Sequence, residues 1–137
     1  MSEPYTGGCA CGAIRYRIAG DPIVMLDCQC RQCQRESGTG HASHLTFQCD
    51  NVVVEGEATH WQATGDGGIV KDRAFCPTCG SPVYMTFPAM PDYFVVRAAS
   101  LDDPTRYRPQ LISWTAAAQP WDHVDPQLPR FDRMPPS

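Results

Sequence analysis

The sequence predicts an all-β protein built from short strands. Three observations support this prediction: short segments of apolar or alternating residues recur along the chain, Gly and Pro stand in nearly every gap between them, and no segment keeps a long helical period. A length of 137 residues suits one domain with one core. Because no repeat or long linker divides the chain, we expect residues 1–137 to form a single domain.

The predicted elements follow one another at short intervals. In residues 14–18 every second residue is apolar and the two between are arginines, which is the pattern of a half-buried strand. The other strand-like segments are residues 23–26, 45–49, 52–54, 59–63, 69–74, 83–87, 93–98 and 110–115. Residues 31–37 suit at most a turn or two of helix. The proline-rich tail from about residue 120 should be extended, with Trp121 and Phe131 packing on the body.

Charge and hydropathy exclude several classes of partner. The formal net charge is −4, and the chain has one lysine, Lys71, and scattered arginines, so it lacks the basic stripe that nucleic acid requires. An anionic membrane surface is excluded on the same grounds, and no apolar run is long enough to span a bilayer. The first eight residues show no secretory signal. We therefore expect a cytoplasmic protein in a reducing compartment.

The cysteine content is the strongest functional signal. Eight cysteines in a reducing compartment point to metal binding rather than to a disulfide framework. Two groups, Cys9-Ala10-Cys11-Gly12 and Cys76-Pro77-Thr78-Cys79-Gly80, each end in a glycine that allows backbone N–H groups to face the sulfurs. Four thiolates from two such groups make a closed tetrahedral site. We predict a structural zinc on Cys9, Cys11, Cys76 and Cys79.

A third group of cysteines predicts an open metal site. Cys28, Cys30 and Cys33 form C-x-C-x-x-C, and three protein ligands with one vacant position are typical of catalytic zinc. A zinc with three thiolates carries a net charge of −1, so a soft thiolate suits the fourth position better than a hard oxygen. Arg31 and Arg35 are close in sequence and are predicted to balance the charge and to hold a carboxylate of that thiol.

Other interpretations of this group stay open. Cys49, His41 or His44 could complete it, which would leave two closed structural sites. Cys30 and Cys33 could instead be a redox pair, although such a motif normally follows a βαβ pattern that this strand-rich sequence lacks.

The motifs taken together resemble a known family. The ordered segments are Gly7–Gly12, Cys28–Gly38, Phe75–Ser81, Arg97–Pro104 and Leu128–Phe131. In this order they resemble the glutathione-dependent formaldehyde-activating enzyme and centromere protein V family over nearly the whole chain. The resemblance implies a β-tent of small antiparallel sheets clasped by zinc–cysteine sites. It also implies a structural zinc on the four cysteines above and a more labile zinc on Cys28, Cys30 and Cys33.

The activity that the resemblance implies is the formation of S-hydroxymethylglutathione from glutathione and formaldehyde, a reaction classed with carbon–sulfur lyases. We therefore expect a zinc-dependent lyase-type enzyme that adds a small thiol, glutathione or a similar one, to an aldehyde such as formaldehyde. Cys28, Cys30, Cys33 and Arg35 are the expected catalytic residues, and Arg31 with Arg35 the expected thiol-binding residues. The alternative is a non-catalytic zinc module that binds a protein partner, or a carrier of the thiol or aldehyde.

Overall fold

The computed structural model describes residues 3–135. In this range the chain forms ten strands and one α-helix, α1 (Arg31–Ser37). The strands are β1 (Tyr5–Gly8), β2 (Arg15–Ile18), β3 (Val24–Cys28), β4 (Ala42–Gln48), β5 (Val52–Glu55), β6 (Thr59–Thr64), β7 (Val70–Phe75), β8 (Pro82–Thr86), β9 (Tyr93–Arg97) and β10 (Leu111–Ser113). The predicted all-β class is confirmed, and the helix lies where residues 31–37 suggested one.

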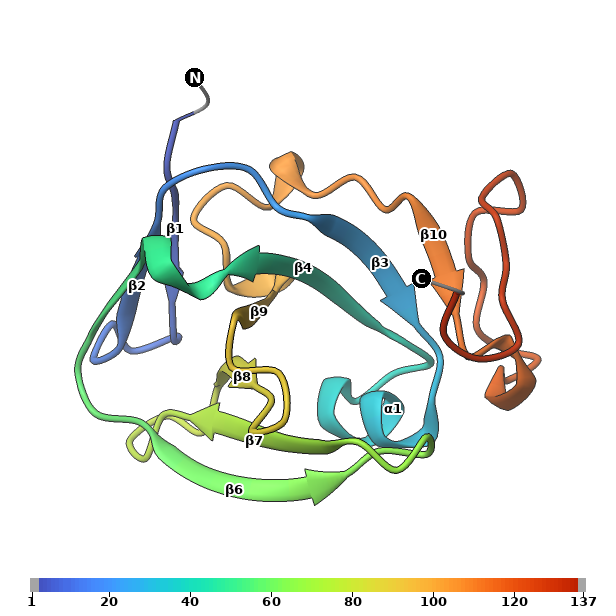
Figure 1. The fold of residues 1–137 in the computed structure, drawn as a ribbon, viewed down its shortest axis with the longest axis horizontal. Coiled ribbons are helices and arrows are strands. Elements are labelled where there is room, and N and C mark those ends of the chain that lie inside the picture. The colour runs from blue at the N-terminus through green and yellow to red at the C-terminus, as the bar shows by residue number, and fades with distance from the viewer. Residues whose placement is uncertain (1–2, 136–137) are drawn as a thin grey trace.

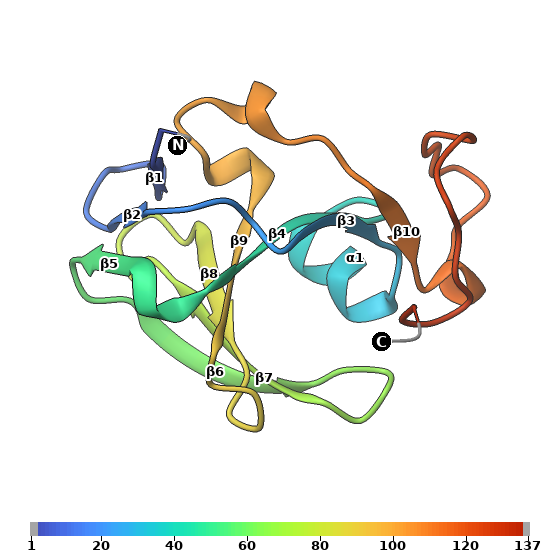
Figure 2. The ribbon, with the colours of Figure 1, turned by 45° about the horizontal axis from the view of Figure 1, so that its top comes forward.

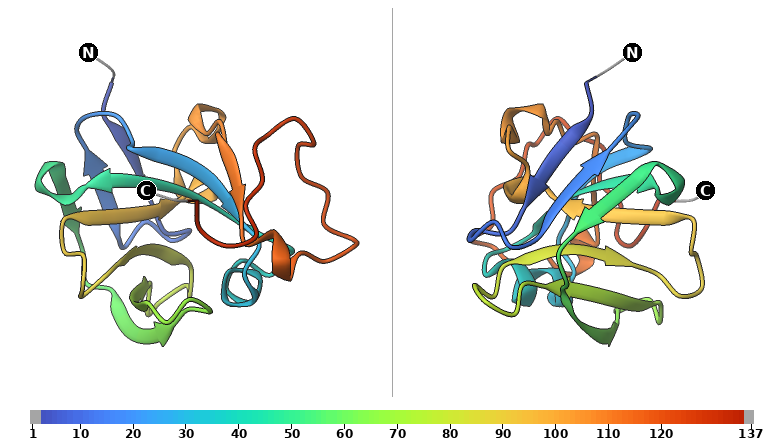
Figure 3. Two further views of the ribbon diagram at one scale, coloured as in Figure 1. Left: turned by 45° about the vertical axis from the view of Figure 1, so that its right-hand side comes forward. Right: turned by 90° about the vertical axis from the view of Figure 1, so that its left-hand side faces the viewer.

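The strands form two sheets. The smaller has the order β1-β2-β5, and the larger has the order β10-β3-β4-β9-β8-β7-β6. Neighbouring strands are antiparallel except β10, which runs parallel to β3. The larger sheet curls so that β3 and β4 face β6 and β7 across the molecule, and α1 lies at one end between these two walls (Figures 1 and 2). The tail after β10 runs along the outside (Figure 3).

The main core lies between the two sheets and follows the period-two pattern of the strands. In β2, Tyr16 and Ile18 are buried while Arg17 is exposed, as alternation predicts. From the larger sheet, Leu45 and Phe47 of β4 and Val96 of β9 join the same core. This core holds the smaller sheet against the larger one.

A smaller cluster of buried residues surrounds α1 and contains three of the cysteines, Cys28, Cys30 and Cys33, together with Leu26 and Ala42. Local chemistry fixes both ends of the helix. The Cys30 side chain caps the N-terminus by accepting from the backbone N–H of Cys33, and Gly38 ends the helix at φ 79°. The helix therefore begins at one metal-ligand candidate and carries another in its first turn.

Some elements differ from the predictions. Strand β1 was not predicted, because it contains Gly7 and Gly8 and forms through its pairing with β2 and a bridge between Gly7 and Leu101. The predicted packing of Trp121 is wrong, since this residue is 58% exposed. Phe131 is partly buried, and its N–H donates to the carbonyl of Ile112 at 3.0 Å, so the tail is held at β10. Within residues 3–135 no helix has the length and hydropathy to cross a membrane.

Candidate metal centres and active-site cavity

The first cysteine group is brought together by two turns. Cys9 and Cys11 lie between β1 and β2, and Cys76 and Cys79 lie between β7 and β8, so residues far apart in sequence converge. The four sulfurs all lie within 4.8 Å of one another. The Cys11 Sγ atom is 3.6 Å from Cys9 Sγ and 3.7 Å from Cys76 Sγ. A tetrahedron of Zn–S bonds has sulfur–sulfur edges of about 3.8 Å, so the donor set fits zinc.

Backbone N–H groups surround these sulfurs. Cys9 Sγ accepts from the N–H of Ile14 at 3.3 Å, and Cys76 Sγ accepts from the N–H of Thr78 at 3.4 Å and of Cys79 at 3.5 Å. The hydroxyl of Ser81 links the two turns, because its oxygen accepts from the N–H of Ala10 and from the thiol of Cys79, both at 3.2 Å. These donors disperse thiolate charge and fix the sulfur positions, as expected around a structural metal.

The second group is assembled locally and is more deeply buried. Cys28 ends β3, Cys30 caps α1 and Cys33 lies in the helix, and all three are buried. Their sulfurs also lie within 4.8 Å of one another. The thiols of Cys28 and Cys33 donate to Cys30 and lower its pKa to about 2, while contact with the other two sulfurs raises the pKa of Cys33. Three sulfurs that compete for protons in this way suit a shared divalent cation.

Two buried arginines lie behind this group, and both contact one carboxylate. Arg73 of β7 and Arg97 of β9 each form an ion pair with Glu36 of α1, and Arg73 also donates to Gln32 Oε1 at 2.7 Å. Burial lowers the pKa of both arginines, and the three cysteines of the second group act in the opposite direction. Two guanidinium groups with one carboxylate leave a net positive charge, which complements an anionic cysteine–metal site.

A cavity of about 160 Å³ opens onto the second group, with Cys28 and Cys30 in its wall. His44 of β4 and Lys71 of β7 also line it. His44 Nε2 lies 3.9 Å from Cys33 Sγ. Burial lowers the pKa of His44 to about 3, with further contributions from Lys71 and Arg73, so its imidazole is neutral at neutral pH. The second group is therefore accessible from a cavity that also contains a neutral imidazole and a lysine.

The structure separates Cys49 and His41 from the three-cysteine group and places His44 beside it. Cys49 donates its thiol to the carbonyl of Pro91 at 2.8 Å and belongs to neither cysteine group. His41 Nδ1 lies 2.9 Å from both carboxylate oxygens of Asp122. His44 is adjacent to Cys33, but it falls outside the set whose donor atoms all lie within 4.8 Å of one another.

Arg31 and Arg35 face a different cavity. They line a space of about 440 Å³ together with Trp61 and Thr64, on the side of α1 that faces β6. Neither arginine lines the cavity at Cys28 and Cys30, so their role in binding a thiol stays a prediction. Lys71 is the cation that lines the cavity at Cys28 and Cys30. It is the single lysine of the sequence, and it was not predicted to be a site residue. Its position depends on the register of β7, which the sequence does not reveal.

The chain matches one protein family model, a relative named for the same family and a solved structure with the same fold. A family model described as glutathione-dependent formaldehyde-activating enzyme matches residues 4–117. A protein of Halomonas elongata, provisionally named a glutathione-dependent formaldehyde-activating enzyme, is 29% identical over 126 residues, which is 87% of this chain and 80% of the relative. A crystal structure of a Rhodobacter sphaeroides protein shares the fold with a TM-score of 0.56 and 20% identity, covering 92% of this chain and 98% of the other.

Proposed function

This chain belongs to the glutathione-dependent formaldehyde-activating enzyme family, and we propose that it is a zinc-dependent carbon–sulfur lyase-type enzyme that adds a small thiol to an aldehyde. Glutathione is the proposed thiol and formaldehyde the simplest aldehyde. The observation that carries the proposal is the contrast between the two cysteine groups. One has four sulfurs, whereas the other has three and opens onto a cavity. That contrast fits one structural site and one reactive site.

Both groups of donors suit zinc. Cys9, Cys11, Cys76 and Cys79 would hold the structural ion, and Cys28, Cys30 and Cys33 would hold the reactive one. When bound at the second group, zinc supplies positive charge that favours the thiolate form of an incoming thiol. Two arginines that share one carboxylate lie behind these cysteines, and their net positive charge balances the negative charge of the thiolates; they are Arg73 and Arg97, paired with Glu36.

The proposed reaction balances without an oxidant or reductant. The sulfur of the thiol forms a bond to the carbonyl carbon, the C=O double bond opens, and the thiol proton ends on the oxygen, which gives a hemithioacetal. The cavity holds the two reactants together, and so contributes orientation. The neutral imidazole of His44 lines the cavity and can donate a hydrogen bond to the developing alkoxide.

The charged ends of glutathione need cations at the site. Lys71 lines the cavity and is the first candidate for a glutathione carboxylate. Arg31 and Arg35 line the neighbouring cavity and are further candidates for a glutathione carboxylate, as the sequence predicts. Asp66 borders both cavities, so the two spaces are adjacent. We place the protein in the cytoplasm, where thiols stay reduced.

The test is the rate at which the adduct of glutathione and formaldehyde forms and exchanges, measured by NMR exchange spectroscopy with zinc-loaded protein. We expect the protein and its Cys49→Ser variant to accelerate exchange over the uncatalysed rate. We expect Cys30→Ser to lose that acceleration, because it removes a sulfur from the open group. Full acceleration by the folded Cys30→Ser variant would refute the proposed site.

A further inference from the structure

The cavity beside Cys28 and Cys30 is larger than formaldehyde needs. Its volume is about 160 Å³. An apolar cavity of about 150 Å³ is large enough to bind benzene, whereas one water molecule occupies about 30 Å³ in the liquid. A one-carbon aldehyde beside the sulfur of the thiol would leave much of this space empty. The cavity therefore has room for a substituent of roughly six carbon atoms.

The walls of the cavity are mainly apolar. The large apolar side chains that line it include Ile69, Met85, Phe87, Val95, Trp114 and Met134. They come from β8 and the residue after it, from β9, from the loop before β7 and from the segment after β10. Methionine side chains adapt to ligands of different shapes, and a mostly apolar lining with a few polar groups is typical of small-molecule sites.

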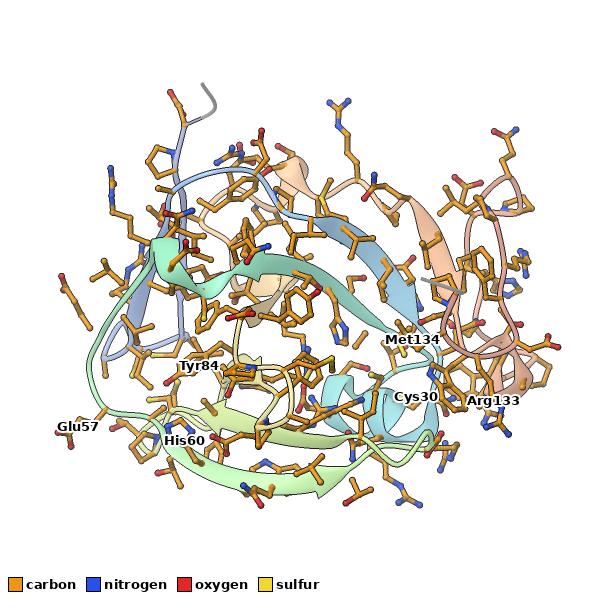
Figure 4. The ribbon with its side chains drawn as sticks, in the orientation of Figure 1. Cys30, Glu57, His60, Tyr84, Arg133 and Met134 are labelled. Atoms are coloured by element: carbon orange, nitrogen blue, oxygen red, sulfur yellow. The ribbon has the colours of Figure 1, made fainter. Side chains whose placement is uncertain are left out.

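The lining residues differ in depth, which orients a ligand. Cys30 is 1% exposed and His44 6%, whereas Ile69 is 40% and Met134 53% exposed. The sulfurs and the imidazole therefore lie at the buried end, and Ile69 and Met134 lie at the mouth. Figure 4 shows Met134 beside Cys30, with Arg133 next along the tail. An aldehyde would enter carbonyl first and leave its apolar substituent against the methionines and Trp114.

Trp114 is held in place at a conformational cost. It is the non-glycine residue with positive φ in residues 3–135, at φ 61° and ψ 39°. Such strain persists only where surrounding contacts maintain it, and it clusters at ligand sites. Here the backbone N–H of Trp114 donates to the backbone carbonyl of Arg133 at 3.1 Å, and a Cβ on Gly67 would lie 3.3 Å from Trp114 Cζ2. The tail and the β6–β7 loop thus fix the indole as a wall of the cavity.

We propose that this cavity selects aldehydes with an apolar substituent of about five or six carbons, such as hexanal, over one-carbon or two-carbon aldehydes. This inference rests on the proposed function and names its substrate class. The reaction is unchanged: the C–S bond forms at C1 of hexanal, the C=O double bond opens, and the thiol proton moves to the oxygen. The remaining chain lies along the apolar walls.

The kinetic test compares hexanal with acetaldehyde, since their carbonyl groups are alike and they differ by four methylenes. Each buried methylene favours binding by about fourfold. We expect the acceleration over the uncatalysed rate with glutathione to be at least tenfold greater for hexanal. Ile69→Asp should abolish this preference, because it places a carboxylate at the mouth. Val70→Asp is the matched control, since Val70 is similarly exposed but does not line the cavity.

A second readout does not depend on catalysis. The chain has five methionines, and Met85, Met90 and Met134 line the cavity, whereas Met25 contacts the N–H of Arg108 and packs on the other core. Titration of ¹³C-methyl-methionine protein with hexan-1-ol, an unreactive analogue, should shift the three cavity methyl signals and leave that of Met25 unchanged. The absence of shifts, or an equal shift at Met25, would overturn the inference.

The outcomes separate this inference from the proposed function. If formaldehyde and acetaldehyde exchange are accelerated and hexanal gains no advantage, the apolar selectivity is refuted and the proposed function stands. If hexan-1-ol shifts the cavity methyl signals but no aldehyde is accelerated, the thiol–aldehyde function is refuted, and the substrate proposal that rests on it falls as well.

Discussion

The substitution Glu36→Gln removes the one carboxylate that the two buried arginines share. The Arg73 side chain is 1% exposed, the Glu36 side chain 10% and the Arg97 side chain 12%, so water replaces little of the lost interaction. Glutamine has nearly the same shape, so the change removes charge without opening a cavity. Two guanidinium groups would then lie close together behind the second cysteine group without the carboxylate that pairs with both of them.

The loss of folding stability expected for Glu36→Gln follows from the burial of this ion pair. Breaking a buried ion pair by removing one partner costs about 3–5 kcal/mol, because the other charge stays buried and unpaired. Folded domains are stable by only about 5–15 kcal/mol, so this loss is a large fraction of the total. At roughly 3 °C per kcal/mol for a chain of this size, the melting temperature should fall by about 9–15 °C.

The assay is urea unfolding of zinc-loaded protein, followed by circular dichroism, which gives the free energy of unfolding for each variant. The matched control is Asp102→Asn, which breaks another Arg–carboxylate pair, that of Arg15 and Asp102, with side chains 41% and 47% exposed. Exposed pairs contribute less than about 1 kcal/mol, so the control should change stability little. An equally small loss of unfolding free energy in both variants would contradict this prediction.

Three further predictions concern the cysteine sites. Cys76→Ser should remove one zinc per chain and lower the free energy of unfolding by about 4 kcal/mol or more, because it removes a ligand of the four-cysteine site. Cys49→Ser is the control and should retain all zinc. Elemental analysis measures the zinc content, and urea unfolding measures the stability. Gly8→Ala should lower zinc content at the four-cysteine site, because its Cβ would overlap the carbonyl oxygen of Ile14 beside Cys9, and a metal content equal to that of the parent protein would contradict this. Lys71→Ala should raise KM for glutathione by about tenfold, and by more than Arg35→Ala does, since Lys71 lines the cavity with the cysteines and Arg35 does not. If only Arg35→Ala raised KM, Arg35 and not Lys71 would be the residue that binds a glutathione carboxylate.

Local sequence patterns predicted the strands and the helix well. Alternation in residues 14–18 and the short segment that suits a turn or two of helix at residues 31–37 are local features, and the structure contains a strand and a helix at those places. The pairing of strands is not local. The parallel contact of β10 with β3 joins residues far apart in the chain, and β1 forms from a glycine-containing segment only because β2 offers it a pairing edge.

The convergence of the candidate ligands could be anticipated because cysteine spacing is distinctive, but their surroundings could not. The structure brings both cysteine groups together in the sets expected from the sequence. In contrast, Arg73, Arg97 and Glu36 come from three different elements, and nothing in their local sequence indicates an ion network. The cavity is likewise formed by β8, β9 and the tail, so its apolar lining emerges only from tertiary packing.

Whether the protein has one closed and one open zinc site is tested by the zinc content per chain of reduced protein purified without chelator. It is measured before and after dialysis against millimolar glutathione. We expect nearly two zinc ions per chain before dialysis and a fall toward one after it, since glutathione competes only at the three-cysteine group. Two zinc ions that never change would contradict it, because both sites would then be closed.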